Sequence, residues 1–224
     1  MPERRMYSKP KLYTGDILDF NTFGESDPPR VKCAETKEGK KIYRKETGEV
    51  HTIKEEKRML YTLHEAGVSV EIPFEGGDPQ VLYTLDEGRD IMDVLDSFDQ
   101  KKRETTFAQI AQELAKIHNA GILHGDMHEK NIVYSKTGKI VFIDLELGHF
   151  IQTKTELPSM TDDEYYSWYA SKLADEVKSL ITSFEDLGKI RTNEKHTLVD
   201  SYLAHIDPKN AKIKIALQDK LNRS

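Results

Sequence analysis

Cysteine is nearly absent from this sequence: Cys33 is the only one among 224 residues. A disulfide within the chain and a cysteine-built zinc site are therefore both excluded. Long apolar runs are absent too, since no stretch approaches the roughly 18 apolar residues that span a bilayer. Residues 1–10 also lack the apolar core of a signal peptide. We therefore expect no membrane span and a reducing compartment, the cytoplasm.

An excess of positive charge is also missing, because the formal net charge at pH 7 is -6. Such a chain has no general attraction for nucleic acid, which is not predicted as a direct substrate. Hydrophobic residues make up 37% and charged residues 32%, which is typical of a folded globular protein. The length allows one functional unit, either a single core or two small lobes.

The first third of the sequence is predicted to be rich in strands. Short apolar stretches bounded by turn residues indicate five of them, at residues 12–23, 30–35, 40–45, 70–74 and 81–85. A helix is expected at residues 52–66, where Ile53, Glu56, Leu60 and Leu63 recur at spacings of three and four. Glu56 is therefore predicted to point inward with the apolar side chains.

From about residue 90 the apolar pattern becomes helical. Residues 105–119 form one predicted helix, residues 165–184 carry the strongest apolar stripe, and two weaker helices follow. A hairpin at residues 131–134 and 140–143 interrupts the helices. The expected fold class is α+β, with strands first and helices after them.

The polar segment HGDMHEKN, residues 124–131, lies between a predicted helix and the hairpin, and the hairpin leads to Asp144. Phosphoryl transfer from a nucleotide needs a carboxylate near the attacking hydroxyl and oxygen ligands for magnesium. Asp126 is the candidate for the first task. Asn131 and Asp144 are the candidate metal ligands.

This segment resembles the catalytic loop of the protein-kinase-like superfamily, H-x-D-x-x-x-x-N, which a hairpin with a metal-binding aspartate follows. The resemblance implies a two-lobed fold: a five-stranded antiparallel N-lobe with one helix, residues 1–88, and a mainly helical C-lobe, residues 89–224. Together they would form one kinase-like domain. The implied cofactors are ATP and Mg²⁺, and the implied partner is a nucleotide.

The resemblance also assigns residues before the catalytic loop. The superfamily places a phosphate-binding lysine on its third strand and a glutamate that pairs with it on the next helix. Lys45 and Glu56 match these positions, with Lys41 as the competing lysine. The inward-pointing glutamate is consistent with that role.

Further positions follow from the same resemblance. Gly24 falls where the glycine-rich loop belongs, although the loop here has one glycine. The hinge that contacts adenine through backbone groups would contain Leu85, Asp86 and Glu87. Asp175 matches the helical aspartate that anchors the catalytic loop.

The acceptor of the phosphoryl group stays open. No Ala-Pro-Glu element follows Asp144 and the next helix begins soon after it, which resembles RIO-type kinases and the small kinase subunit of the tRNA threonylcarbamoyladenosine machinery. This favours an atypical serine/threonine protein kinase, or a kinase or ATPase subunit with protein partners. His128 instead makes the loop HGDxHxxN, which resembles aminoglycoside, choline and sugar-lipid kinases and indicates a small-molecule acceptor.

Two other classes stay open at lower rank. A pseudokinase binding subunit would keep the fold without turnover. A metallohydrolase would use His124, Asp126, His128 and His149 to hold zinc or iron. That second alternative leaves Lys45 without a role.

Overall fold

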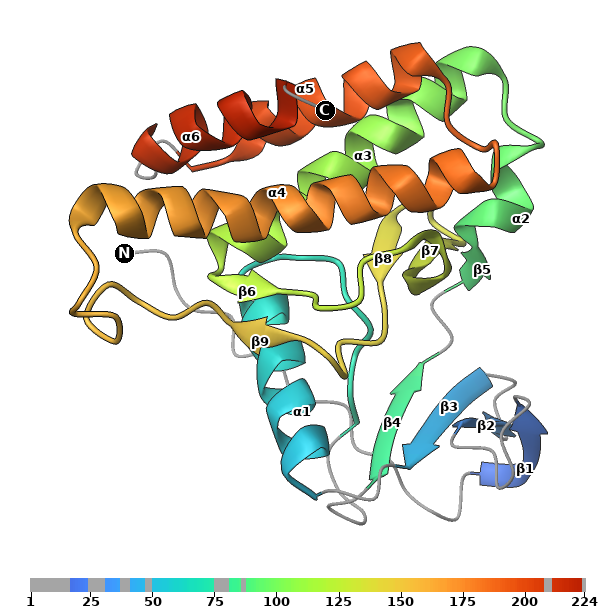
Figure 1. Ribbon diagram of the computed structural model, residues 1–224. Coiled ribbons are helices and arrows are strands. Elements are labelled where there is room, and N and C mark those ends of the chain that lie inside the picture. Colours follow the sequence, from blue (N-terminus) through green and yellow to red (C-terminus); the bar gives the residue numbers. More distant parts are fainter. Residues whose placement is uncertain are drawn as a thin grey trace, which may run out of the picture. The chain divides into compact units, whose positions relative to one another are not determined.

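The chain divides into two compact units, one of residues 1–61 and 71–86 and the other of residues 62–70 and 87–224. Figure 1 shows the secondary structure of both units in the computed structural model. The structure describes residues 17–23, 31–36, 41–46, 50–74, 81–85, 88–207 and 211–222. The elements of each unit follow in turn.

The first unit contains a four-stranded antiparallel sheet. Its strands lie in the order β1 (Ile17–Phe23), β2 (Val31–Thr36), β3 (Lys41–Glu46) and β4 (Val81–Leu85). Ile42 on β3 is fully buried and lies opposite Ala34 on β2 and Leu85 on β4. Helix α1 (Val50–Glu65) follows β3, and its Ile53 and Leu60 are fully buried, as their spacing predicts.

The prediction of a strand at residues 70–74 is wrong, because this segment forms only isolated bridges. Val70 forms an isolated parallel bridge with Phe142 in the second unit, and Pro73 forms an isolated antiparallel bridge with Thr84 in the first. Proline has no amide hydrogen to donate to a ladder, and the segment changes units within a few residues. The described sheet therefore has four strands instead of five.

The second unit is mainly helical and contains two small antiparallel sheets. The sheets have the orders β5-β7-β8 and β6-β9. In chain order its elements are β5 (Gly88–Asp90), α2 (Ile91–Leu95), α3 (Gln100–Asn119), β6 (Ile122–Leu123), η2 (Glu129–Asn131), β7 (Ile132–Ser135), β8 (Ile140–Phe142), β9 (His149–Phe150), α4 (Asp162–Asp186), α5 (Thr192–His205) and α6 (Ala211–Asn222).

Local capping explains where the long helices begin. Asp99 accepts the backbone N–H of Lys102 at 2.7 Å and starts α3 five residues before the predicted boundary. Thr161 and Glu164 form a capping box at the start of α4.

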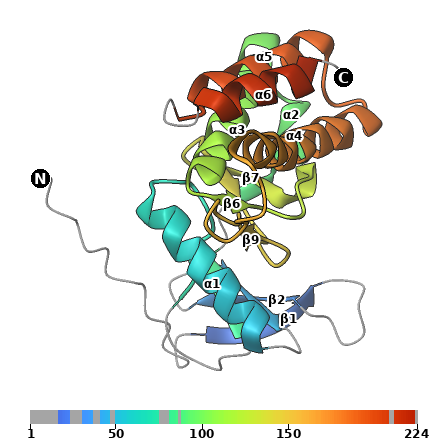
Figure 2. The same ribbon diagram turned by 60° about the vertical axis from the view of Figure 1, so that its left-hand side comes forward.

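Figure 2 views α4 nearly along its axis, with α6 packed beside it. The buried face of α4 includes Leu173, Val177, Leu180, Ile181 and Phe184.

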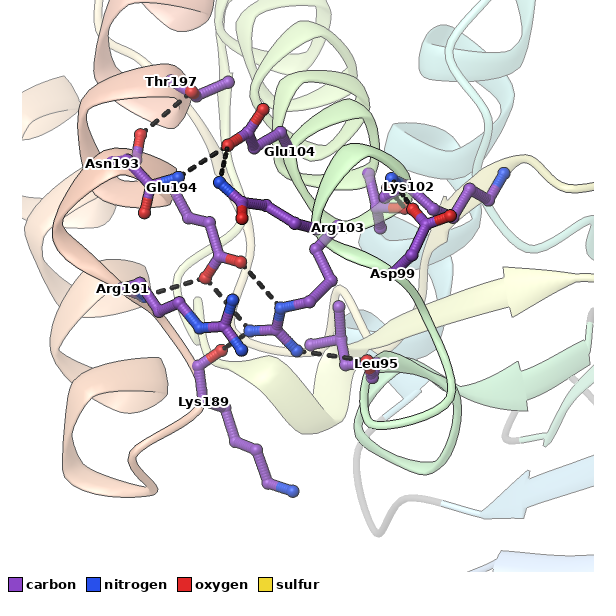
Figure 3. Close-up of polar contacts among 12 residues, drawn as sticks. Leu95, Asp99, Lys102, Arg103, Glu104, Lys189, Arg191, Asn193, Glu194 and Thr197 are labelled. Atoms are coloured by element: carbon purple, nitrogen blue, oxygen red, sulfur yellow. Dashed lines mark hydrogen bonds and ion pairs between the residues drawn. The ribbon is translucent and has the colours of Figure 1, made fainter.

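A buried ion pair joins α3 to α5 (Figure 3). The Arg103 guanidinium donates to both carboxylate oxygens of Glu194, at 2.6 and 3.0 Å, and to the carbonyls of Leu95 and Lys189. Glu194 is fully buried and also accepts the backbone N–H of Arg191 at 2.8 Å. Since the charges are matched and their hydrogen-bonding groups are used, this pair is compatible with a buried interface.

None of the described helices has a segment long and apolar enough to cross a membrane.

Candidate active site

Helix α4 holds the predicted catalytic loop at three backbone positions. The Glu176 carboxylate accepts the backbone N–H groups of His124, at 3.1 Å, and Gly125, at 2.5 Å. Ser179, one turn further along α4, donates its hydroxyl to the carbonyl of Met127 at 3.0 Å. Because residues three apart lie on the same helix face, one face of α4 fixes the loop around residue 126.

The anchor of the loop is therefore Glu176, and the assignment of this role to Asp175 is wrong. Adjacent residues on an α-helix point about 100° apart, so only one of the two acidic side chains can face the loop. Glu176 is 9% exposed, whereas Asp175 lies on the exposed face.

Within the loop, the carboxylate of Asp126 is oriented by two neighbours. His128 Nε2 lies 3.2 Å from Asp126 Oδ2. The Asn131 amide nitrogen donates to the Asp126 backbone carbonyl at 2.9 Å and to Oδ2 at 3.3 Å. The Asp126 side chain is still 45% exposed, so the carboxylate is both held and accessible to solvent.

The contacts of His128 indicate where its ring proton lies. The backbone N–H of Lys130 points at His128 Nδ1 at 3.2 Å, and an N–H group can only donate. Nδ1 is therefore the acceptor, and a neutral ring carries its proton on Nε2, which lies 3.2 Å from Asp126 Oδ2 and 3.1 Å from the Asn131 amide nitrogen. His128 thus contacts the Asp126 carboxylate directly.

His124 connects the loop to the end of the hairpin. Its ring is fully buried, and Nε2 lies 2.9 Å from the carbonyl of Ile143, to which it donates. Burial lowers the pKa of this imidazole, against the opposing effect of Glu176. Nδ1 makes no hydrogen bond within the described part of the chain. In a neutral ring Nδ1 is a lone pair, so no buried proton is left without an acceptor.

Asp144 lies two residues after the end of β8, which pairs with β7, the strand that follows the predicted catalytic loop. The Ile143 N–H donates to the carbonyl of Asn131 at 3.1 Å, which fixes Asp144 beside the loop. Asp144 has φ 63°, the only positive φ among the described non-glycine residues. Left-handed backbone costs energy for residues with a Cβ atom and is commonest in functional sites and turns.

Lys45 and Glu56 form a separate cluster in the first unit. Lys45 Nζ lies 3.3 Å from Glu56 Oε1, and the two side chains are 12% and 0% exposed. β3 supplies the lysine and α1 the glutamate. Lys41, the competing lysine, is exposed at the start of β3. The pair is nearly buried, and each charge compensates the other.

Three of the other sequence-predicted positions, Gly24, Asp86 and Glu87, lie outside the described residues. The fourth, Leu85, ends β4 with its backbone opposite Ile42. His149 is exposed on β9, and its Nδ1 lies 3.4 Å from the carbonyl of Leu147.

Comparison with family models gives a match to the lipopolysaccharide kinase (Kdo/WaaP) family over residues 35–157. The matched segment is more than half of the chain and includes every residue from Lys45 to Asp144. The chain belongs to this family. Membership of the Kdo/WaaP family confirms the predicted resemblance to protein-kinase-like enzymes.

Individual relatives point to both branches of the superfamily. The chain is 26% identical over 135 residues to the KEOPS complex subunit Bud32 of Pyrococcus abyssi, which covers 56% of this chain and 61% of the relative. It is 26% identical over 151 residues to the probable serine/threonine-protein kinase BUD32 homolog of Archaeoglobus fulgidus, covering 67% and 65%. The chain thus spans less than two thirds of the length of each archaeal relative.

A sugar kinase is among the relatives as well. The 3-deoxy-D-manno-octulosonic acid kinase of Vibrio parahaemolyticus is 31% identical over 101 residues, 41% of this chain and 42% of the relative. Protein-directed and sugar-directed members of the wider Kdo/Bud32 group are therefore both similar to this chain.

The donor set of this Kdo/WaaP family member fits magnesium. A hard cation prefers carboxylate and amide oxygens, which Asp144 and Asn131 carry. The Asn131 amide nitrogen is used on Asp126, so its Oδ1 is the atom suited to a metal. Within the described residues no three His, Cys, Asp or Glu side chains are grouped as a transition-metal site requires.

Sequence reasoning missed Ser179 and two buried residues behind Glu176, namely His118 and Tyr202. His118 and Tyr202 lie on apolar helix faces, where a polar residue at a core position is the only signal that the sequence offers.

Proposed function

We propose that this chain transfers the γ-phosphoryl group of ATP to a hydroxyl group, with Asp126 as the catalytic carboxylate. The observation that carries the proposal is the state of this side chain, which His128 and Asn131 hold at Oδ2 while the carboxylate stays 45% exposed. A held but accessible carboxylate can orient an acceptor hydroxyl and accept its proton.

The other proposed roles follow the superfamily pattern. Lys45, supported by Glu56, would bind the α- and β-phosphates. Asn131 Oδ1 and Asp144 would bind Mg²⁺, which neutralises phosphate charge when present. The left-handed backbone of Asp144 supports this role, because such unfavourable backbone conformations in residues with a Cβ atom cluster at functional sites.

We further propose that residues 1–88 and 89–224 act as the two lobes of one kinase-like domain. Backbone groups at Leu85, Asp86 and Glu87 would contact adenine, and Gly24 would lie in the loop over the phosphates. A cytoplasmic location stays a prediction based on the single cysteine.

A protein hydroxyl, on serine or threonine, is the first candidate acceptor. The two archaeal relatives carry names of a complex subunit and a serine/threonine-protein kinase, which supports a protein acceptor and protein partners. The short connection between β8 and α4 also supports it, since a minimal kinase without a long docking segment would take part of its substrate surface from a partner.

A sugar hydroxyl is the second candidate. The Kdo/WaaP match and the contact between His128 and Asp126 favour it, because histidine at this place of the loop is the feature that resembles small-molecule kinases. The two candidates use the same carboxylate and differ in what approaches it.

The metallohydrolase alternative has less support. His124, one of its required ligands, is fully buried and donates Nε2–H to the Ile143 carbonyl. That nitrogen is therefore not available to a metal. A pseudokinase would have the same fold, and a measurement of ATP turnover distinguishes it from the proposed enzyme.

Labelled phosphate transfer tests the proposal. The protein is incubated with γ-labelled ATP and Mg²⁺, alone, with candidate protein partners, and with a 3-deoxy-octulosonic acid sugar. We expect Asp126→Asn to lower transfer or ATP turnover at least about a hundredfold, since it removes a general base. The control, Asp175→Asn, changes an exposed carboxylate on α4 and should leave turnover unchanged.

Wild-type turnover by Asp126→Asn would remove Asp126 from its role. Label in protein would support the first acceptor, and label in the sugar the second.

A further inference from the structure

Behind the catalytic loop, a chain of buried polar groups connects three helices. The hydroxyl of Tyr202 on α5 lies 2.5 Å from His118 Nδ1 on α3, and His118 Nε2 lies 2.9 Å from Glu176 Oε2 on α4. The exposed fractions of the three residues are 0%, 1% and 9%. Burying a polar group costs free energy unless it is hydrogen-bonded, and each of these three side chains has a hydrogen-bond partner.

Only one direction of hydrogen bonding satisfies every member of this chain. Glu176 accepts the backbone N–H groups of His124 and Gly125, as an ionised carboxylate does. His118 Nε2 must then donate to Glu176, which leaves Nδ1 as an acceptor in a neutral ring. The Tyr202 hydroxyl therefore donates to Nδ1.

The ionisation of both ends agrees with this direction. Burial alone would raise the pKa of Glu176, but the hydrogen bond and electrostatic interaction with His118 and the hydrogen bonds from Gly125 and His124 outweigh it and lower that pKa. Burial raises the pKa of Tyr202 well above its ordinary value, so its hydroxyl keeps the proton that it donates.

At the other end of this hydrogen-bonded series, Glu176 binds the backbone next to the proposed catalytic carboxylate. The two amides that Glu176 binds belong to the residues one and two places before Asp126. α5 is also tied to the end of α3, because Asn119 donates to the His205 carbonyl at 2.9 Å and accepts the Asp207 N–H at 3.0 Å. Tyr202 is thus held where it can fix the ring of His118.

We propose that His118 and Tyr202 are positioning residues of the catalytic loop, which act through Glu176 to fix the backbone before Asp126. Tyr202 selects the ring tautomer, and His118 fixes which way the Glu176 carboxylate faces. The catalytic part of this inference rests on the proposed function of Asp126; the structural part does not.

Two tyrosine variants separate this role from general packing. Tyr202→Phe removes the hydroxyl on the His118 ring and keeps the aromatic core. Tyr169→Phe, the matched control, removes another buried hydroxyl, which within the described residues donates to the backbone carbonyl of His118 at 3.5 Å. We expect Tyr202→Phe to lower kcat about threefold to tenfold with an unchanged KM for ATP, and Tyr169→Phe to change neither.

Amide hydrogen exchange measures how firmly the backbone of the loop is held, and it does not require enzyme turnover. In Tyr202→Phe the amides of His124 and Gly125 should exchange about threefold to tenfold faster than in the wild type, while those of Tyr169→Phe should not. The rest of the protein reports whether either variant is generally loosened.

A second pair of variants changes the middle of the chain. His118→Phe removes both ring nitrogens, whereas His118→Gln keeps one donor and one acceptor. We expect kcat of folded protein to fall about tenfold or more in His118→Phe and to recover in part in His118→Gln. A role in packing alone predicts the reverse order, since phenylalanine fills a buried ring site better than glutamine.

The inference is overturned if Tyr202→Phe exchanges at His124 and Gly125 like Tyr169→Phe, or if the histidine variants follow the packing order. If the wild type shows no turnover, the proposed function fails instead. In that case the exchange comparison alone decides whether the buried chain fixes the loop.

Discussion

At the scale of single residues, the proposed catalytic loop needs glycine at position 125, because of both the backbone conformation there and the lack of space for a side chain. Gly125 has φ +83°, and a Cβ atom there would lie 2.0 Å from the carbonyl oxygen of Leu147. Residues with a Cβ rarely adopt this backbone, and the close carbonyl leaves no space for one. The segment after Asp144 thus packs directly on the loop that carries Asp126.

Replacing Gly125 by alanine should therefore cost more than the backbone strain alone. Gly121 provides the control, because it has φ +74° and a Cβ atom added there would meet nothing within 4 Å. We expect Gly121→Ala to lower the free energy of unfolding by about 1–2 kcal/mol and Gly125→Ala by about 2–5 kcal/mol. Denaturant unfolding measures both. Equal losses of unfolding free energy in the two variants would show that the backbone at Leu147 shifts to make room for the added methyl group.

Sequence patterns could predict the roles of residues that lie at a fixed spacing within one loop. They could not predict roles that depend on how the helices pack. Asp126 and Asn131 are five apart within one loop, and their contact follows from that spacing. Asp175 and Glu176 are adjacent acids on one helix, and the rotation of α4 in the core decides which faces the loop. The partners of His118 come from helices distant in sequence, so no local pattern reveals them.

At the scale of elements, α3 and α5 are joined by charge as well as by apolar contact (Figure 3). Burial alone would raise the pKa of Glu194, but the hydrogen bonds from Arg103 and Arg191 outweigh it and lower that pKa. The group is thus deprotonated more readily in the folded chain than in the unfolded one. Its contribution to stability is present above the unfolded pKa and is lost as the pH falls through the folded pKa.

Glu194→Gln should destabilise the fold by about 3–5 kcal/mol at pH 7, because the buried Arg103 charge loses its partner. The difference from the wild type should shrink as the pH falls below the ordinary glutamate value of 4.5. Glu185→Gln, which alters a 45% exposed carboxylate paired with Lys195, should cost less than about 1 kcal/mol. Unfolding curves at several pH values test this. A difference that stays constant down to low pH would contradict it.

Short elements were the part of the fold that the sequence could not predict. β6 and β9 have two residues each, too few for an alternation to be visible. Residues 70–74 have an apolar composition typical of a strand, yet Pro73 and the change of unit restrict them to single bridges. The long helices and the β7–β8 hairpin, whose patterns extend over several residues, were predictable.

At the scale of the whole molecule, the proposed function needs two clusters that belong to different units. Lys45 and Glu56 lie in the first unit, and Asp126, Asn131 and Asp144 in the second. We propose that both serve one nucleotide, the first through the phosphates and the second through Mg²⁺. The family match across residues 35–157 supports this, since it includes both clusters.

Binding of ATP with and without Mg²⁺ tests this central claim most directly, measured by titration calorimetry on the wild type and three variants. Lys45→Met and Asp144→Asn should each weaken Mg²⁺-dependent ATP binding about tenfold or more, since each removes a charged contact. Lys41→Met, which changes an exposed lysine on the same strand, should bind like the wild type. Wild-type affinity in either Lys45→Met or Asp144→Asn, or ATP binding that ignores Mg²⁺ in the wild type, would contradict a single nucleotide site.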